Sequence, residues 1–141
     1  MFRSLPRLTF LALLALALAS CQKPLLATLG QPVGLPVHHA ATFAKSDLEL
    51  YFRRVASDSR CPTGAQCIWA GEAFVTVDAR LLKGPVESFD LRLPGAAVPD
   101  SAIWKPYDGY RIRLVSLEPF PAVGKAADST SYVGTFLVEK R

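Results

Sequence analysis

Three cysteines and two histidines are the residues of this chain whose types suggest chemistry: Cys21, Cys61, Cys67, His38 and His39. Five residues separate Cys61 from Cys67, whereas zinc-binding cysteines are usually about two to four residues apart. The histidines are adjacent, and adjacent side chains on a strand point to opposite faces, so one metal ion could not easily use both. We therefore expect no metal site and no cofactor.

Catalytic motifs are absent from the sequence. The chain contains no G-x-S-x-G, no H-E-x-x-H, no P-loop and no dinucleotide-binding glycine pattern. Serine, histidine and aspartate all occur, but nothing places a nucleophile beside a base. We predict that the protein is not an enzyme.

The first twenty residues have a composition of their own. Arg3 and Arg7 are followed by an uncharged stretch, 8–19, that is rich in Leu and Ala. A membrane-spanning helix needs about 20 apolar residues, so this stretch is typical of a secretory signal peptide. Its end, Leu18-Ala19-Ser20-Cys21, resembles the lipobox of bacterial lipoproteins. The alternative is an ordinary signal peptide that happens to end beside a cysteine.

The lipobox resemblance implies that residues 1–20 are removed and that Cys21 becomes an acylated N-terminus. Several acyl chains hold a protein on a bilayer essentially permanently, because each buried CH₂ contributes about 0.8 kcal/mol. Gln22 stands where enteric bacteria read Asp as a signal for inner-membrane retention. We therefore expect the outer membrane, facing the periplasm, in a Gram-negative source. Residues 21–31 are predicted to be the lipidated N-terminus and a short tether.

Lipidation of Cys21 leaves Cys61 and Cys67 as an even pair in a compartment where disulfides persist. We expect these two cysteines to be joined. Closing so short a loop stabilises the folded state by about 2 kcal/mol in the chain-entropy model. The bond would also fix the shape of the loop.

The charge of the chain argues against a nucleic-acid partner. The 141 residues include 16 Lys and Arg and 12 Asp and Glu, and two of the basic residues belong to the leader. Nucleic-acid-binding domains usually carry a clustered basic excess. Basic residues at Arg53-Arg54, Arg111, Arg113 and Lys140-Arg141 could attract anionic lipid headgroups, but the interspersed acids favour an ordinary solvated face.

Alternation of apolar and polar residues dominates the chain after residue 31. It predicts strands near 33–37, 48–55, 67–81, 89–93, 110–114 and 132–138. A slip in the pattern at Arg54-Val55 predicts a bulge, and Asp108-Gly109 predicts a tight hairpin. We therefore expect one all-β domain over 32–141, a small antiparallel β-sandwich of immunoglobulin-like outline with six to seven strands and one disulfide. A small barrel is the alternative.

The most distinctive passage begins with Asp58-Ser59-Arg60-Cys61-Pro62 and ends, after four more residues, with Cys67-Ile68-Trp69-Ala70-Gly71. The pattern D-S-R-C-P-x4-C-[IV]-W-x-G resembles that of a group of largely uncharacterised bacterial secreted proteins and lipoproteins. A looser likeness extends to Pro119-Phe120-Pro121. The resemblance implies a small β-domain with a disulfide-closed loop, and it carries no activity.

The same passage can be interpreted from its residues. On a strand that starts at Cys67, Trp69 would share a face with the cysteine and pack against the disulfide, and Gly71 would let another backbone approach. Arg60 beside Asp58 would tie the loop to a strand or offer a polar contact. A structural corner is the favoured interpretation, with Asp58, Arg60 and Trp69 as candidate partner-binding residues.

These observations predict a non-enzymatic lipoprotein of the bacterial cell envelope that binds or supports another envelope component. Tethering to a membrane raises its effective concentration near such a partner. The expected partners are the bilayer, through Cys21, and an envelope protein or anionic lipid, but no nucleic acid. The alternative is an inhibitor or stress-protective module that presents a rigid Cys61–Cys67 loop. A hydrolytic or metal-dependent enzyme is the least favoured function.

Overall fold

The fold comes from a computed structural model that describes residues 23–125 and 128–141. The predicted signal peptide, residues 1–20, and Cys21 lie outside the described residues. The described residues form nine strands and one short 3-10 helix, η2. In chain order the elements are β1 (Leu25–Thr28), β2 (Val33–Pro36), β3 (Ala40–Ala44), β4 (Leu48–Asp58), β5 (Glu72–Leu81), β6 (Glu87–Pro94), η2 (Asp100–Ala102), β7 (Lys105–Tyr107), β8 (Tyr110–Glu118) and β9 (Val133–Lys140).

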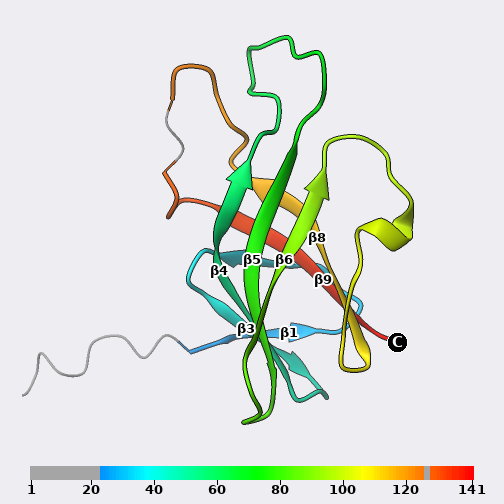
Figure 1. The fold of residues 1–141 in the computed structure, drawn as a ribbon. Coiled ribbons are helices and arrows are strands. Elements are labelled where there is room, and N and C mark those ends of the chain that lie inside the picture. The colour runs from blue at the N-terminus through cyan, green and yellow to red at the C-terminus, as the bar shows by residue number, and fades with distance from the viewer. Residues whose placement is uncertain (1–22, 126–127) are drawn as a thin grey trace, which may run out of the picture.

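Two sheets pack face to face. One has five strands in the order β1-β3-β4-β5-β6, and the other has four in the order β2-β9-β8-β7. Figure 1 shows β8 and β9 crossing behind β4, β5 and β6. Neighbouring strands are antiparallel except β1, which runs parallel to β3. The predicted all-β sandwich is confirmed, with this one parallel pair as a difference.

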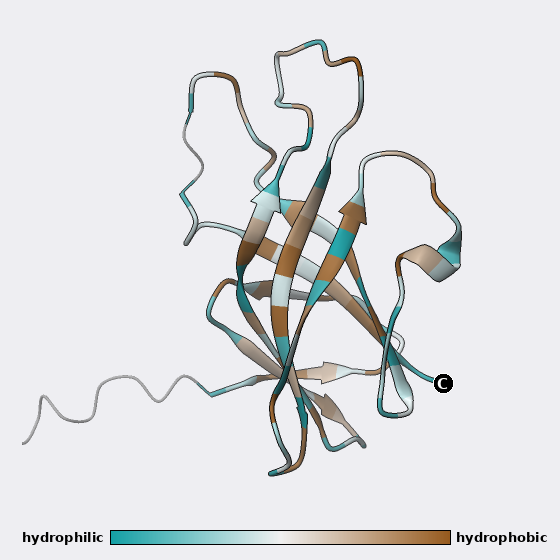
Figure 2. Cartoon of the chain, viewed as in Figure 1, coloured by the Kyte–Doolittle hydropathy of each residue, from teal (hydrophilic) through white to brown (hydrophobic). Residues whose placement is uncertain are grey.

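The core lies between the sheets and is built from alternate residues of the long strands. Hydrophobic and polar bands alternate along β5 and β6 in Figure 2, as expected for strands with one buried face. Phe52 of β4 and Phe136 of β9 meet edge to face, with ring centroids 5.3 Å apart. Gly134 leaves room for this pair, because a Cβ there would lie 2.8 Å from the Phe136 ring and 3.2 Å from Phe52.

The described residues contain more strands than the six or seven predicted, because β1 and β3 do not stand out in the sequence. Both include alanines, whose small apolar side chains make the alternation hard to detect. Their inward positions are nevertheless buried, as at Ala27, Ala41 and Phe43. β1 lies inside the segment 21–31 that was predicted to be a tether, so the sandwich begins earlier than expected.

Local features of the long strands agree in part with the sequence. The register of β4 on β5 shifts between Phe52 and Arg54, which confirms the predicted bulge, and a second shift follows between Val55 and Ser57. Tyr107 pairs with Tyr110 around the predicted hairpin turn. The strand expected from residue 67 is shorter than predicted, because β5 begins at Glu72.

Among the described residues, no helix is long and apolar enough to cross a bilayer.

Candidate functional site

The two ends of the sandwich are defined by its loops. The segment 59–71 and the segment between β8 and β9, described at 119–125 and 128–132, join strands at what we call the loop end, and the segment that leads to β7 starts there after Pro94. The turns 45–47 and 82–86 lie at the opposite end, which we call the N-terminal end because β1 enters the sheet near it (Figure 1). The ten residues of β5 run from one end to the other, a length of about 30 Å.

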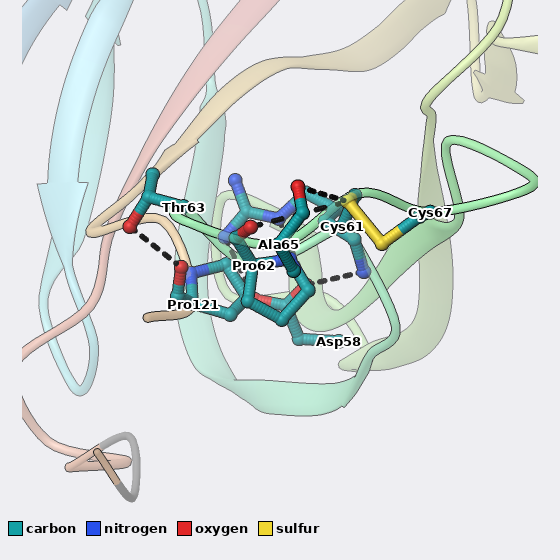
Figure 3. The surroundings of a disulfide bond; sticks show 8 residues. Asp58, Cys61, Pro62, Thr63, Ala65, Cys67 and Pro121 are labelled. Atoms are coloured by element: carbon teal, nitrogen blue, oxygen red, sulfur yellow. Dashed lines mark hydrogen bonds and ion pairs between the residues drawn. A yellow bond between two sulfur atoms is a disulfide. The ribbon is translucent and has the colours of Figure 1, made fainter. Parts of the chain in front are cut away.

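The disulfide loop, residues 59–71 between β4 and β5, contains the Cys61–Cys67 pair and is attached to the rest of the loop end. Cys61 and Cys67 are bonded, with their Cα atoms 5.9 Å apart, which confirms the predicted pairing. The Thr63 N–H donates to the Pro121 carbonyl at 2.8 Å, and the Thr63 hydroxyl donates to the same oxygen at 3.3 Å (Figure 3). The loop between β4 and β5 is therefore held against the loop between β8 and β9.

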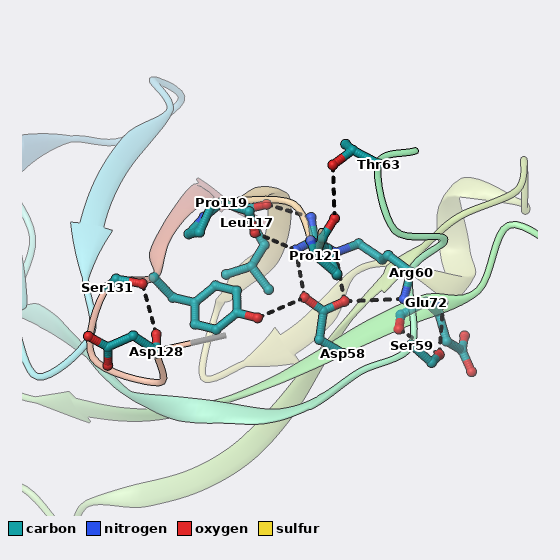
Figure 4. A network of polar contacts seen from close by, with 11 residues as sticks. Asp58, Ser59, Arg60, Thr63, Glu72, Leu117, Pro119, Pro121, Asp128 and Ser131 are labelled. Carbon is teal, nitrogen blue, oxygen red and sulfur yellow. Dashed lines mark hydrogen bonds and ion pairs between the residues drawn. The ribbon is translucent and has the colours of Figure 1, made fainter. Parts of the chain in front are cut away.

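Arg60 ties the two sheets together just before the disulfide. Its Nε donates to Oδ1 of Asp58 at 2.8 Å, and its Nη2 donates to Oδ2 at 2.7 Å. The guanidinium also donates to the carbonyls of Leu117 and Pro119, which lie where β8 ends in the other sheet (Figure 4). The side chains of Arg60 and Asp58 are only 3% and 7% exposed. The prediction that Arg60 ties the loop to a strand is confirmed.

The ionised form of Asp58 is stabilised by its neighbours. Burial opposes ionisation, but hydrogen bonds from Arg60 and from the Tyr132 hydroxyl, at 3.2 Å, outweigh it and hold the pKa of Asp58 below its ordinary value. Burial, together with the charge of Asp58, raises the pKa of Tyr132. The Arg60 guanidinium lies 4.2 Å from the ring centroid of Phe120. These charged groups are occupied by contacts within the protein.

Two glycines allow three backbone segments to cross at the base of the disulfide loop. Gly71 has a φ of 69°, and a Cβ there would lie 1.9 Å from the Ser59 carbonyl oxygen. The Gly95 N–H donates to the Gly71 carbonyl at 2.9 Å. A Cβ on Gly95 would lie 2.2 Å from that oxygen. The predicted close backbone approach at Gly71 is confirmed.

The disulfide loop presents two apolar side chains to solvent directly after Cys67. Ile68 is 96% exposed and Trp69 is 76% exposed. The prediction that Trp69 lies on a strand is wrong, because β5 begins only at Glu72, after the left-handed turn at Gly71. Of the three candidate partner-binding residues, only Trp69 is thus exposed, while Asp58 and Arg60 are buried. Partner binding by these residues stays a prediction.

Two hollows lie beside these exposed side chains. One has a volume of about 400 Å³ and is lined by Leu93, Val115 and Phe120, with Arg60 also in its wall. The other has a volume of about 360 Å³ and includes Trp69. The hollows share Ala70, Pro94 and Gly95. Several residues of this surface, among them Arg60, Trp69 and Gly71, were singled out in the sequence, and Phe120 lies in the Pro-Phe-Pro segment of the resemblance.

Exposed large apolar side chains gather at the two ends of the sandwich. Ten such residues occur in the part of the chain that the structure describes. Six lie at the loop end or on the adjoining strand residues: Ile68, Trp69, Val115, Phe120, Val123 and Val133. Four lie toward the N-terminal end: Leu25, Leu26, Leu82 and Val86. The sandwich therefore has two apolar ends.

The outer faces of the sheets are polar and charge-paired. Ion pairs join Arg53 to Asp78, Arg80 to Glu49, Arg92 to Glu72, Arg111 to Glu139 and Arg113 to Asp100. Burial opposes ionisation of Asp78, but hydrogen bonds from Arg53 and Ser88 outweigh it and lower its pKa. Three of the arginines considered for lipid headgroups are thus already paired with acids. The interpretation as an ordinary solvated face is favoured, and binding to anionic lipid stays a prediction.

The two histidines occupy the turn between β2 and β3 rather than a strand. Both are exposed. His38 Nδ1 lies 3.3 Å from the Tyr51 hydroxyl, and His39 Nδ1 lies 3.1 Å from the carbonyl of Val37. Within residues 23–125 and 128–141, no group of three or more His, Cys, Asp or Glu side chains is placed to hold a metal ion.

No family model, curated protein or solved structure matches this chain. The site is therefore interpreted from its own geometry.

Proposed function

We propose that this protein is a lipid-anchored, non-enzymatic module of the bacterial cell envelope that presents its disulfide loop to a second envelope protein. The observation that carries the proposal is the exposure of Ile68 and Trp69, which directly follow the residues closed by the Cys61–Cys67 disulfide. Tryptophan is enriched among the residues that contribute most binding energy in protein interfaces. A partner that covers the two side chains would remove their apolar surface from water.

The construction of the loop supports binding as its role. The disulfide closes it, Thr63 attaches it to the β8–β9 loop, and Arg60 holds its start between the two sheets. A loop that is already ordered loses little conformational entropy when it binds. The hollow beside Phe120 offers an apolar recess into which a partner side chain would fit.

The direction of the loop supports anchoring at the other end of the molecule. Three residues separate Cys21 from Leu25 at the start of β1, a span of at most about 14 Å. The disulfide loop lies beyond the opposite end of β5 (Figure 1). A chain acylated at Cys21 would therefore hold Ile68 and Trp69 on the side away from its own anchor.

Site-specific crosslinking in intact cells tests the proposed partner. A photoreactive amino acid in place of Trp69 is expected to capture one specific envelope protein. The same amino acid in place of Glu87, exposed on β6 at the N-terminal end, serves as the control and is expected not to capture it. Changing Ile68→Ser in the Trp69-labelled chain should reduce the capture without unfolding the domain, because the Ile68 side chain makes no core contact.

Labelling with palmitate tests the proposed anchor. The chain is expected to incorporate the label and to fractionate with membranes, and Cys21→Ser is expected to abolish both. A wild-type chain that stays unlabelled and water-soluble would refute anchoring. Turnover of a substrate by the purified protein, without a specific crosslinked neighbour, would refute the binding role.

An inhibitor or stress-protective module is the second candidate, and the rigidity of the disulfide loop favours it. In that case the captured neighbour would be an enzyme, and added purified protein would lower its activity. The double variant Ile68→Ser/Trp69→Ser would lose this effect. Inhibition that survives the double variant would exclude these two side chains as the inhibitory contact.

A further inference from the structure

We infer that the N-terminal end of the sandwich is a lipid-contact surface, which rests on the bilayer to which the chain is anchored. This inference depends on the proposed acylation of Cys21 and goes beyond it, because an acyl anchor alone does not orient the domain. The surface consists of Leu82 and Val86 of the turn between β5 and β6, with Leu26 on the outer face of β1 and Leu25 at its edge on the other face.

The strand register brings these four residues toward one end. Leu25 pairs with Ala41, which pairs with Leu50, and Leu50 pairs with Ala79 near the end of β5. Leu82 follows the last residue of β5 directly. Figure 1 shows β1 and the β5–β6 turn in the lower part of the molecule, opposite the disulfide loop.

Leucine is unfavourable at position 82, in both backbone conformation and exposure, unless something outside the chain contacts its side chain. Its φ is 50°, a left-handed conformation that favours Gly, Asn or Asp over a large apolar residue. Its side chain is 66% exposed, and its fixed contact is a backbone hydrogen bond to the Asp47 carbonyl at 2.7 Å. Neither backbone conformation nor core packing accounts for leucine here. An apolar partner at this turn does.

The position of the anchor identifies that partner as a lipid surface. Cys21 is within about 14 Å of Leu25 along the chain, so acyl chains on Cys21 keep this end of the sandwich beside the bilayer. Apolar residues of surface-bound segments enter the boundary between headgroups and acyl chains to a depth of about 5–10 Å. Leu26, at 73% exposed, and Val86, at 55%, are available for such contact.

Charge at this end has a basic excess. The exposed bases are Lys23, beside Leu25, with Lys45, Lys83, Lys140 and Arg141, and the exposed acids nearby are Asp47, Glu87 and Asp108. Anionic headgroups should therefore add to the apolar contact. The consequence is an upright domain, with the disulfide loop about 30 Å above the bilayer, one β5 length away.

Fluorescence quenching in vesicles tests this orientation. The full acylated protein is placed in vesicles of phosphatidylethanolamine and phosphatidylglycerol whose acyl chains carry bromine, and the wild-type signal of Trp69 and Trp104 is subtracted. Val86→Trp is expected to add fluorescence that the bromolipid largely removes. Val123→Trp changes a valine of similar exposure, 62%, at the loop end, and its added fluorescence is expected to persist.

A second variant keeps the test independent of folding. Leu82→Asn suits the left-handed backbone, so the domain should be at least as stable, while quenching in the Val86→Trp background should fall. Equal quenching at positions 86 and 123, or none at position 86 in protein that floats with the vesicles, would overturn the lipid-contact surface and leave the anchor intact. If the protein carries no acyl chain and does not float with the vesicles, both the lipid-contact surface and the proposed anchor would be overturned.

Discussion

Among single residues, Arg60 does most to position the disulfide loop. Its side chain joins a carboxylate at the end of β4 to two carbonyls at the end of β8, and it is almost completely buried. A buried ion pair need not add net stability compared with apolar residues. Removing one partner, however, leaves an uncompensated buried charge, which is strongly destabilising.

We predict that Asp58→Asn lowers the free energy of unfolding by about 3–5 kcal/mol, because Arg60 loses its counter-charge in a buried site. Urea denaturation at pH 7 measures this change. Asp128→Asn is the matched control, since Asp128 is exposed and its hydrogen bonds among the described residues are to nearby Thr130 and Ser131. Similar losses in the two variants would contradict the role given to the buried pair.

We also predict that the domain loses stability in acid. The pKa of Asp58 is lower in the folded state than in the unfolded state, so at acidic pH the unfolded chain binds more protons. The contribution of Asp58 is complete above its unfolded pKa of about 3.9 and is lost as pH falls through the lower folded value. Denaturation measured from pH 7 to pH 2 should show a steeper decline in the wild type than in Asp58→Asn. Parallel declines would contradict the prediction.

Among the elements, the loop between β4 and β5 depends on backbone contact at its base as well as on the Arg60 side chain. Ser59, Gly71 and Gly95 come from three chain segments whose backbones cross within hydrogen-bonding distance. This crossing stops β5 at Glu72 and directs residues 68 and 69 outward. A side chain at the crossing would have to displace backbone, which a close-packed fold resists.

We predict that Gly71→Ala destabilises the domain much more than Gly64→Ala. Both glycines have positive φ, so each alanine incurs a conformational cost of about 1–2 kcal/mol. Only at Gly71 does the new Cβ also collide with the backbone, whereas at Gly64 it meets nothing within 4 Å. Thermal unfolding of the two oxidised variants provides the comparison. Equal shifts in melting temperature would show that the cost of positive φ accounts for both losses and that the collision at Gly71 adds nothing.

At the scale of the whole molecule, one hydrophobic core lies between the two sheets. The outer faces of the sheets are polar, and the exposed large apolar residues lie at the two ends of the sandwich. Phe52 and Phe136 meet across the sheets, and ion pairs other than the buried Arg60–Asp58 pair, such as Arg53–Asp78 and Arg111–Glu139, lie on the outer faces. Because Gly134 contacts this aromatic pair, a substitution at Gly134 tests whether the two sheets unfold together.

We predict that Gly134→Ala destabilises both sheets in a single transition, by about 1–3 kcal/mol, through overpacking against the two rings. Gly34→Ala, in the neighbouring strand of the same sheet, has its nearest contact at 3.7 Å and should cost less. Circular dichroism and tryptophan fluorescence should give coincident unfolding curves for both variants. Separate transitions for the two probes would contradict a shared core.

Much of the fold follows from the linear pattern alone. Alternation between neighbours reports which face of a strand is buried, so the long strands, the bulge after Phe52 and the sandwich class were predictable. The bond between Cys61 and Cys67 followed from their number and from the expected compartment. β1 and β3 were missed, because alanine contributes too little to the alternation.

The properties of the candidate site arise only when distant segments meet. Arg60 is buried because it reaches Leu117 and Pro119, more than fifty residues away in the chain. Trp69 is exposed because the glycine crossing ends β5 early. The separation of the exposed apolar residues into two ends depends on strand order and register. Period-two alternation is a property of neighbours, and it contains no information about which strands pair or where their loops point.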